Sequence, residues 1–426
     1  MAKVSRRTWI AAGAAAAFGL PAGALWLDGR DAAATVSRFG ALRRDPRGVL
    51  DLLEGFRYVI VDRAGRPMND GYPVPPRPDG MACFSSDDGA LVLMRNHELP
   101  RGVAVTRAIG RPWTADAYDR DSPGAVTRLV LDPETLAVRT SNMVLGGTSM
   151  NCSGGACPAG WLSCEEDPDD RRHGYVFLCD PAASALAPPF RVTSYGRFRH
   201  EAAAFESATG RCYLTEDRPD GCLYRFVPAD PAEPFGIGTL FAMKIRGRAR
   251  FDTGPLRTGA GHDIEWVPLD DADPAEDDLR ATAQRLGAAR VVRGEGIHLG
   301  HGRVYVCATA GGPIGCGQIF AIEDDGDRGT LRVIASSEDR AQMDMPDNVT
   351  MDPRGVLWFV EDGEGHDYLR GVAPDGEVFA VGRNALSEGE LTGVCFTPDG
   401  RAMFVNLQEE GLTLRVEGPF ERFASA

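Results

Sequence analysis

A glycine-rich stretch, residues 146–167, brings together residues that could bind a metal. Cys152 stands directly before a Ser-Gly-Gly turn, and a short apolar run ends at Cys164, followed by Glu165 and Glu166. A thiolate beside carboxylates can bind a metal that accepts soft and hard donors, such as iron or zinc. The same residues would also fit a glycine-rich hairpin with a structural disulfide. Taken alone, the stretch favours that simpler interpretation.

Further acids stand beside other short hairpins along the chain. They occur in the segments Asn96-His97-Glu98, Arg199-His200-Glu201, Thr215-Glu216-Asp217, Arg293-Gly294-Glu295, Pro346-Asp347-Asn348 and Glu388-Gly389-Glu390. Any one of these acids would be an ordinary solvated loop residue. Their recurrence beside successive hairpins predicts one shared cluster. Because converging carboxylates cannot all stay ionised without cations, the cluster should hold hard ions such as calcium, with a softer ion at Cys152.

The elements that must position these acids are repeated strand–turn–strand units. Apolar, β-branched or aromatic runs flank Asp, Pro or Gly turns at residues 82–95, 204–216, 296–308, 349–361 and 394–406. Their spread over the whole chain predicts an all-β protein with radial repetition, a β-propeller, rather than a β-sandwich. We expect few helices, and only residues 274–286, an Ala-, Asp- and Arg-rich insertion, show a convincing helical pattern.

Composition excludes some partners. The 426 residues include 46 Lys and Arg against 61 Asp and Glu, which gives a net charge of −15. An acidic chain is a poor ligand for nucleic acid or for an anionic membrane. The 51 glycines and 29 prolines are spread along the chain, which indicates many turns rather than a disordered tail.

The N-terminus has the pattern of an export signal. Ser5-Arg6-Arg7 precedes an apolar run at residues 11–20, which is too short to span a membrane. The paired arginines predict a twin-arginine signal and linker at residues 1–30, followed by a single propeller domain at residues 31–426. We therefore expect a periplasmic or secreted protein without a membrane anchor after processing, which meets the twin-arginine export machinery.

Cysteine spacing and histidine position give further expectations. The chain has ten cysteines, and the pairs Cys212/Cys222 and Cys307/Cys316 are spaced for disulfides between neighbouring strands. His97 and His200 lie beside candidate ligands, where we expect them to support those ligands by hydrogen bonds. The remaining candidates sit in polar turns and are expected to be exposed: His173, His298, His301 and His366.

Taken together, these segments resemble a known family. The segments that carry the resemblance are N-H-E at 96–98, N-C-S-G-G at 151–155 with C-E-E at 164–166, Y-G-R-F-R-H-E at 195–201, T-G-R-C-Y-L-T-E-D at 209–217, R-G-E-G at 293–296, P-D-N at 346–348 and C-F-T-P-D-G-R-A-M-F-V-N at 395–406. With these motifs in family order, the sequence is similar to the PhoX-type alkaline phosphatases from about Asp79 to Glu409.

The resemblance implies a six-bladed propeller that hydrolyses phosphate monoesters at an axial cluster of ferric iron (Fe3+) and calcium (Ca2+). It implies that Arg293 faces the substrate phosphate, assisted by Asn96. Its implied metal ligands are Cys152, Glu166 or its neighbour Glu165, Glu201, Glu295, Glu98 and Asp347.

Two departures weaken the match at the site itself. The loop between Gly155 and Cys164 is one residue shorter than the family pattern, which leaves the choice between Glu165 and Glu166 open. After Gln408, Glu409 and Glu410 replace a usual His-Pro. The alternatives are a calcium-dependent lactonase or other esterase on a similar propeller, and a propeller that binds a ligand without catalysis. Nothing in the sequence requires a partner protein, so we expect a monomer.

Overall fold

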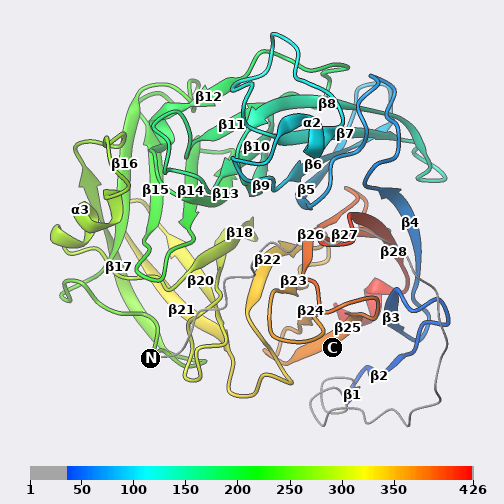
Figure 1. Ribbon diagram of the computed structural model, residues 1–426. Helices are drawn as coiled ribbons and strands as arrows, with labels where there is room; N and C mark the ends of the chain where they lie inside the picture. The colour runs from blue at the N-terminus through cyan, green and yellow to red at the C-terminus, as the bar shows by residue number, and fades with distance from the viewer. Residues whose placement is uncertain (1–35, 425–426) are drawn as a thin grey trace.

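Residues 36–424 fold as five antiparallel β-sheets arranged in a ring (Figure 1). The structure is a computed structural model that describes residues 36–424. The predicted twin-arginine signal lies outside the described residues. Within residues 36–424, no helix is both long enough and apolar enough to span a membrane.

Three of the sheets have four strands each. One contains β5 (Pro78–Ser85), β6 (Leu91–His97), β7 (Gly124–Leu131) and β8 (Val138–Thr148). Another contains β9 (Asn151–Cys157), β10 (Gly160–Glu165), β11 (Val176–Cys179) and β12 (Phe190–Val192). The third contains β26 (Leu391–Phe396), β27 (Ala402–Leu407), β28 (Leu412–Glu417) and β4 (Arg57–Arg63). This third sheet pairs C-terminal strands with β4, so it joins the two ends of the described chain.

The two larger sheets complete the ring. The seven-stranded sheet runs in the order β1 (Val36–Ser37), β2 (Gly40–Arg43), β3 (Leu50–Leu53), β25 (Val378–Asn384), β24 (Tyr368–Val372), β23 (Leu357–Glu361) and β22 (Pro346–Met351). The nine-stranded sheet runs in the order β13 (His200–Glu206), β14 (Arg211–Glu216), β15 (Leu223–Pro228), β16 (Gly238–Ile245), β17 (Gly261–Leu269), β21 (Arg328–Ser336), β20 (Gln318–Asp324), β19 (Arg303–Ala308) and β18 (Gly294–Gly300).

Helices are few and short in the described chain. They are α2 (Val105–Ile109) and α3 (Leu279–Arg285), with 3₁₀ turns at Thr193–Tyr195 and Phe420–Phe423. The helix predicted over residues 274–286 is confirmed in its second half only. The all-β prediction with few helices is confirmed.

Six inner strands surround the middle of the ring: β5, β9, β13, β18, β22 and β26 (Figure 1). Each packs against the next, and β26 packs against β5 to close the ring. The predicted propeller-like arrangement is therefore confirmed. Six separate sheets are not observed, because β17 pairs with β21 and joins two runs of strands into the nine-stranded sheet.

Close contact between inner strands depends on glycine. A Cβ at Gly80 of β5 would lie 2.6 Å from the Cα of Ser153 on β9, and a Cβ at Gly155 would lie 1.9 Å from the carbonyl oxygen of Ala203 on β13. Neither contact is possible with a side chain, so glycine sets how closely these strands approach. Further from the axis, apolar side chains such as Met81, Phe404 and Leu93 fill the layers between sheets.

The predicted disulfides are wrong. All ten cysteines lie in the described part of the chain and are free thiols. Cys212 pairs across the ladder with Phe226, four residues beyond Cys222. Cys307 pairs with Ile319, three residues beyond Cys316. A strand rises about 3.3 Å per residue, so these offsets separate each pair by more than a disulfide can span.

Candidate metal centre

Each of five inner strands presents its second residue to the axis: Asp79, Cys152, Glu201, Glu295 and Asp347. The ladder is irregular at this point in each strand, for example between Pro78 and Met81 and between His200 and Ala203. A bulge frees the residue inside it from regular pairing and re-aims its side chain. The repeated bulge is therefore the local device that turns these donors inward.

Two further positions of the repeat complete the lining. The residues directly after the second strand of each run are Glu98, Glu166, Asp217, Thr309, Asp362 and Gln408. The residues directly before four of the inner strands are Arg77, Arg199, Arg293 and Glu390. These three positions supply every residue that lines an axial cavity of about 130 Å³.

Two groups of donors in this cavity have the geometry of a metal site. In Glu98, Cys152 and Glu166, one donor atom from each residue lies within 4.8 Å of the other two. The same holds for Glu201, Glu295 and Asp347. The first group mixes a thiol with carboxylates and the second has carboxylates alone, which fits a softer ion beside a harder one.

Glu201 is the clearest indication that this cavity could bind a cation. Its side chain is fully buried, and neither carboxylate oxygen has a hydrogen-bond partner in the protein. Oδ1 of the buried Asp79 also lacks a partner, while Oδ2 lies 3.7 Å from the Cys152 sulfur. A buried carboxylate without partners is costly unless a cation or a proton neutralises it.

The pKa values of the cavity residues also reflect the cost of burying several acids together. Burial, followed by the charges of Glu295 and Glu166, raises the pKa of Glu201 well above its ordinary value. Burial raises the pKa of Glu166 to about 7, although the Arg199 guanidinium opposes the shift. Burial, Asp79 and Glu201 raise the pKa of the Cys152 thiol. Bound cations would reverse these shifts, because they favour the ionised donors.

Three arginines partly neutralise the acids. Arg77 binds Glu98 at 2.5 Å, and Arg199 binds both oxygens of Glu166 at 3.0 Å. Arg293 donates to Asp217 and to Glu295, each at 2.7 Å. The φ of Arg293 is 52°, a left-handed conformation that is uncommon for a residue with a side chain. The cavity therefore presents guanidinium groups beside the metal donors, as a site for an anion requires.

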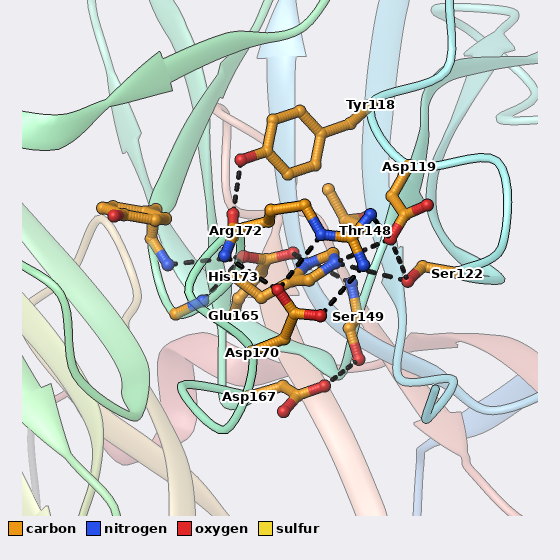
Figure 2. A network of polar contacts seen from close by, with 12 residues as sticks. Tyr118, Asp119, Ser122, Thr148, Ser149, Glu165, Asp167, Asp170, Arg172 and His173 are labelled. Carbon is orange, nitrogen blue, oxygen red and sulfur yellow. Dashed lines mark hydrogen bonds and ion pairs between the residues drawn. The ribbon is translucent and has the colours of Figure 1, made fainter. Parts of the chain in front are cut away.

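The side chains of Glu165 and Glu166 point to opposite sides, and of the two only Glu166 points into the cavity. Glu165 is fully buried and accepts hydrogen bonds from the backbone N–H of Ser149 (2.9 Å) and Gly174 (3.0 Å). His173 Nδ1 lies 2.7 Å from Glu165, with Asp119 on the far side of the ring (Figure 2). Glu165 therefore holds the loop after β10 in place, whereas its neighbour Glu166 lines the cavity.

Asn96 also differs from its expected place. Its amide donates to the carbonyl oxygens of Cys152 and Ser153, at 3.0 and 2.7 Å, and its oxygen accepts from Trp161 and Ser163. The side chain is fully buried and absent from the cavity lining. The structure thus gives no support to contact between Asn96 and a substrate. Its contacts instead hold the backbone of β9 at the cysteine.

Some of the histidines also lie elsewhere than predicted. His97 and His200 are buried, but they bond to Thr127 and to the Gly196 carbonyl, so their predicted hydrogen bonds to candidate ligands are not observed. The prediction that His173 is exposed is wrong, because it is completely buried in the network of Figure 2. Of the others, His301 is exposed, while His298 and His366 are partly buried.

All the other predicted site residues meet at the cavity. Cys152, Glu166, Glu201, Glu295, Glu98, Asp347 and Arg293 all line it. Sequence reasoning placed Asp217 only among the acids of the predicted shared cluster and assigned no role to Asp79, Asp362 or Gln408; all four also line the cavity. A sequence signal could have identified Asp217 and Asp362 as cavity residues. Three equivalent strands end in a pair of acids: Glu165-Glu166, Glu216-Asp217 and Glu361-Asp362. If the second acid of one pair faces the cavity, the second acids of the other two pairs should face it as well.

The fold and the cavity define a class: propeller-like proteins with an axial cavity lined by carboxylates that could bind cations. A profile of the family described as alkaline phosphatase PhoX matches residues 37–125 and 123–411. The chain therefore belongs to the alkaline phosphatase PhoX family. The prediction of an alkaline phosphatase-like phosphoric monoester hydrolase is confirmed at this level.

One of two similar solved structures supports the fold. Pseudomonas fluorescens PhoX, in complex with vanadate, a transition state analogue, superposes with a TM-score of 0.70 at 19% identity, over 87% of this chain and 96% of that one. A periplasmic gluconolactonase of Pseudomonas aeruginosa has a TM-score of 0.46 at 13% identity, over 87% of this chain and 93% of that one. No curated protein sequence matches the chain.

Proposed function

We propose that the protein is an exported phosphatase that hydrolyses phosphate monoesters in its axial cavity, with ferric iron and calcium as cofactors. The observation that carries the proposal is Glu201, a fully buried carboxylate without a hydrogen-bond partner, in a group of three carboxylates with metal-site geometry. Family membership supplies the reaction class, and the vanadate complex of the similar Pseudomonas fluorescens protein supports a phosphoryl substrate.

The donor set fits the proposed cations. Cys152, with Glu98 and Glu166, would hold the softer iron, and Glu201, Glu295 and Asp347 would hold calcium. Asp79 lies beside the thiol and could serve either ion. When bound, such cations polarise phosphoryl oxygens. They also offset the repulsion between the anionic substrate and the carboxylates of the cavity.

The chain itself would bind and orient the phosphate through Arg293. Its planar guanidinium matches the geometry of phosphate oxygens and keeps its charge at any working pH. Asp217 and Glu295 fix the direction of this side chain from two sides. The remaining donors of Arg293 can then bind non-bridging oxygens, where charge is stabilised in the transition state.

We also propose that the propeller has six blades. Six inner strands close the ring, and the nine-stranded sheet can be divided at the β17–β21 pairing into two blades joined at their outer edges. The expected export by the twin-arginine machinery, periplasmic or secreted location, lack of a membrane anchor and monomeric state complete the proposal. Arg6 and Arg7 carry the export part.

The test measures metals and turnover on one preparation. The exported protein should contain iron and calcium by elemental analysis and should hydrolyse p-nitrophenyl phosphate. Glu201→Gln should lower the turnover by about a hundredfold or more, since a metal ligand is lost. Glu216→Gln is the matched control, because Glu216 is equally buried but points away from the cavity to Tyr224.

The alternatives have their own outcomes in this experiment. Calcium without iron, together with hydrolysis of lactones but not phosphate esters, would support the lactonase. Absence of both metals and of all turnover would support a ligand-binding propeller. Either result would overturn the phosphatase proposal.

A further inference from the structure

We infer that Arg199 is a second phosphate-binding residue, held beside Arg293 by Asp217, which acts as a positioning residue. The inference rests on the proposed phosphatase function and extends it to a pair of guanidinium groups. The sequence analysis named Arg293 and Asn96 for the substrate phosphate but not Arg199.

The two arginines share one carboxylate. Nη2 of Arg199 lies 3.5 Å from Oδ2 of Asp217. Nη2 of Arg293 lies 3.4 Å from the same oxygen, and its Nε lies 2.7 Å from Oδ1. Asp217 is mostly buried, with a side chain 9% exposed. One fixed carboxylate therefore holds two guanidinium groups at neighbouring places.

Their places in the fold are equivalent. Arg199 directly precedes β13 and Arg293 directly precedes β18, and these two inner strands pack against each other. Asp217 follows β14, the partner strand of β13. The pair is therefore built on rigid strand ends around the cavity, not on a flexible loop.

Both arginines keep donors available for a ligand. Arg199 uses Nε and Nη2 on Glu166, and Arg293 uses Nε and Nη2 on Asp217 and Glu295. Neither Nη1 donates a hydrogen bond to any residue in the described part of the chain. The two side chains are 28% and 27% exposed and both line the cavity.

A phosphate monoester is the ligand that this pair fits. It is a dianion with three terminal oxygens, so two guanidinium groups can each bind a different oxygen. A structural role for Arg199, confined to neutralising Glu166, would need only the bidentate pair already present. It would not need the second contact to Asp217 or an Nη1 that donates to no residue in the described part of the chain.

The experiment titrates inorganic phosphate into the metal-loaded protein by calorimetry. Arg199→Ala should raise the Kd for phosphate by about tenfold to a hundredfold, the loss expected for a hydrogen bond to a charged group. For p-nitrophenyl phosphate, KM should rise by a similar factor. Asp217→Asn should raise KM about tenfold, and Asp217→Glu should restore part of the affinity.

Arg101→Ala is the matched control. Arg101 also forms a bidentate pair, with Asp167 at 2.5 and 3.0 Å, and its side chain is 31% exposed. Asp167 directly follows Glu166, but neither Arg101 nor Asp167 lines the cavity. Removing Arg101 should leave the Kd for phosphate unchanged.

The metal content of each variant separates the outcomes. If Arg199→Ala keeps its metals and still binds phosphate like the unaltered protein, the inference is wrong. If it loses metals, Arg199→Lys decides, because lysine keeps the charge but not the fork. Weaker phosphate binding by a metal-loaded Arg199→Lys supports the inference, whereas unchanged binding, or metal loss in both variants, overturns it.

Failure of the proposed function gives a different result. An unaltered protein that binds phosphate through Arg199 but hydrolyses no monoester would refute the phosphatase and leave the arginine pair intact. An active phosphatase whose phosphate affinity does not depend on Arg199 would refute only the inference.

Discussion

Adjacent acids in this protein have opposite surroundings. Glu165, Glu216 and Glu361 end three equivalent strands and turn away from the axis, whereas Glu166, Asp217 and Asp362 follow them and line the cavity. The outward acids bind backbone N–H groups and neighbouring side chains, as Glu361 does with Asp344 N at 2.8 Å and Arg370 at 2.5 Å. These contacts brace the loops between strands.

The acids that line the cavity lie close to one another. Glu201, for example, lies close to the carboxylates of Glu295 and Glu166, and neither of its own carboxylate oxygens has a hydrogen-bond donor in the described part of the chain. This arrangement costs stability in the protein without cations and provides ligands once cations bind. The comparison therefore separates acids that hold the fold from acids that hold the site, although the chemistry of the side chains is the same.

The largest effect should follow from replacing the thiol in the cavity. Cys152→Ser exchanges a soft donor for a neutral hydroxyl, so iron should be lost and turnover should fall by orders of magnitude, while calcium is retained in part. Elemental analysis and hydrolysis of p-nitrophenyl phosphate on the same preparation check this. Full iron and full activity in a folded Cys152→Ser protein would contradict the assignment.

A smaller loss of activity should follow at the cavity acid Glu166. Glu166→Gln should lower turnover by about a hundredfold, because a metal ligand is weakened. Its free energy of unfolding without metals should change by no more than about 1 kcal/mol, since the amide can still accept from Arg199. Urea denaturation and steady-state kinetics measure the two quantities. A large loss of stability with unchanged turnover would reverse the roles of the two acids.

The neighbouring outward acid should behave in the opposite way. Glu165→Gln removes a buried charge that accepts from Ser149, Gly174 and His173. The free energy of unfolding should fall by about 3 kcal/mol, as when a buried ion pair is broken. The folded fraction should keep its metals and its turnover. The same denaturation and kinetic measurements give the answer, with Glu166→Gln as the matched variant.

The smallest effect concerns pH. Burial raises the pKa of Glu166 to about 7, above the ordinary 4.5, so between these values the folded protein holds a proton that the unfolded chain has released. Stability without metals should therefore be greatest below about pH 4.5 and should fall as pH rises through 7. From pH 5 to pH 8 we expect a loss of at least about 1.4 kcal/mol, the value of one pKa unit.

Calcium is the control for this pH effect. Because cations bind the ionised carboxylates, added calcium should remove most of the loss at pH 8 and change little at pH 5. Urea midpoints with a chelator and with calcium, at both pH values, make the comparison. Stability that rises with pH in the chelator would show that the cavity acids are already ionised without metals.

Much of the fold could be predicted because it rests on local patterns. The strand–turn–strand units at residues 82–95, 204–216 and 394–406 became β5–β6, β13–β14 and β26–β27. The joining of two runs through β17 and β21 could not be predicted, because nothing local specifies which outer strands meet. The cysteine pairs failed for a similar reason: their spacing along the chain does not give the ladder register.

The amino-acid sequence by itself determined that the protein is a turn-rich, all-β chain of repeated hairpins and that acids recur at the hairpin ends. It also determined that Cys152, Glu201 and Glu295 are candidate ligands. Only the tertiary structure decided which of two adjacent acids faces the axis, because side chains alternate along a strand and one bulge reverses that alternation. The same geometry buried His173, turned Asn96 onto the backbone of β9, and placed Arg199 beside Arg293 around Asp217.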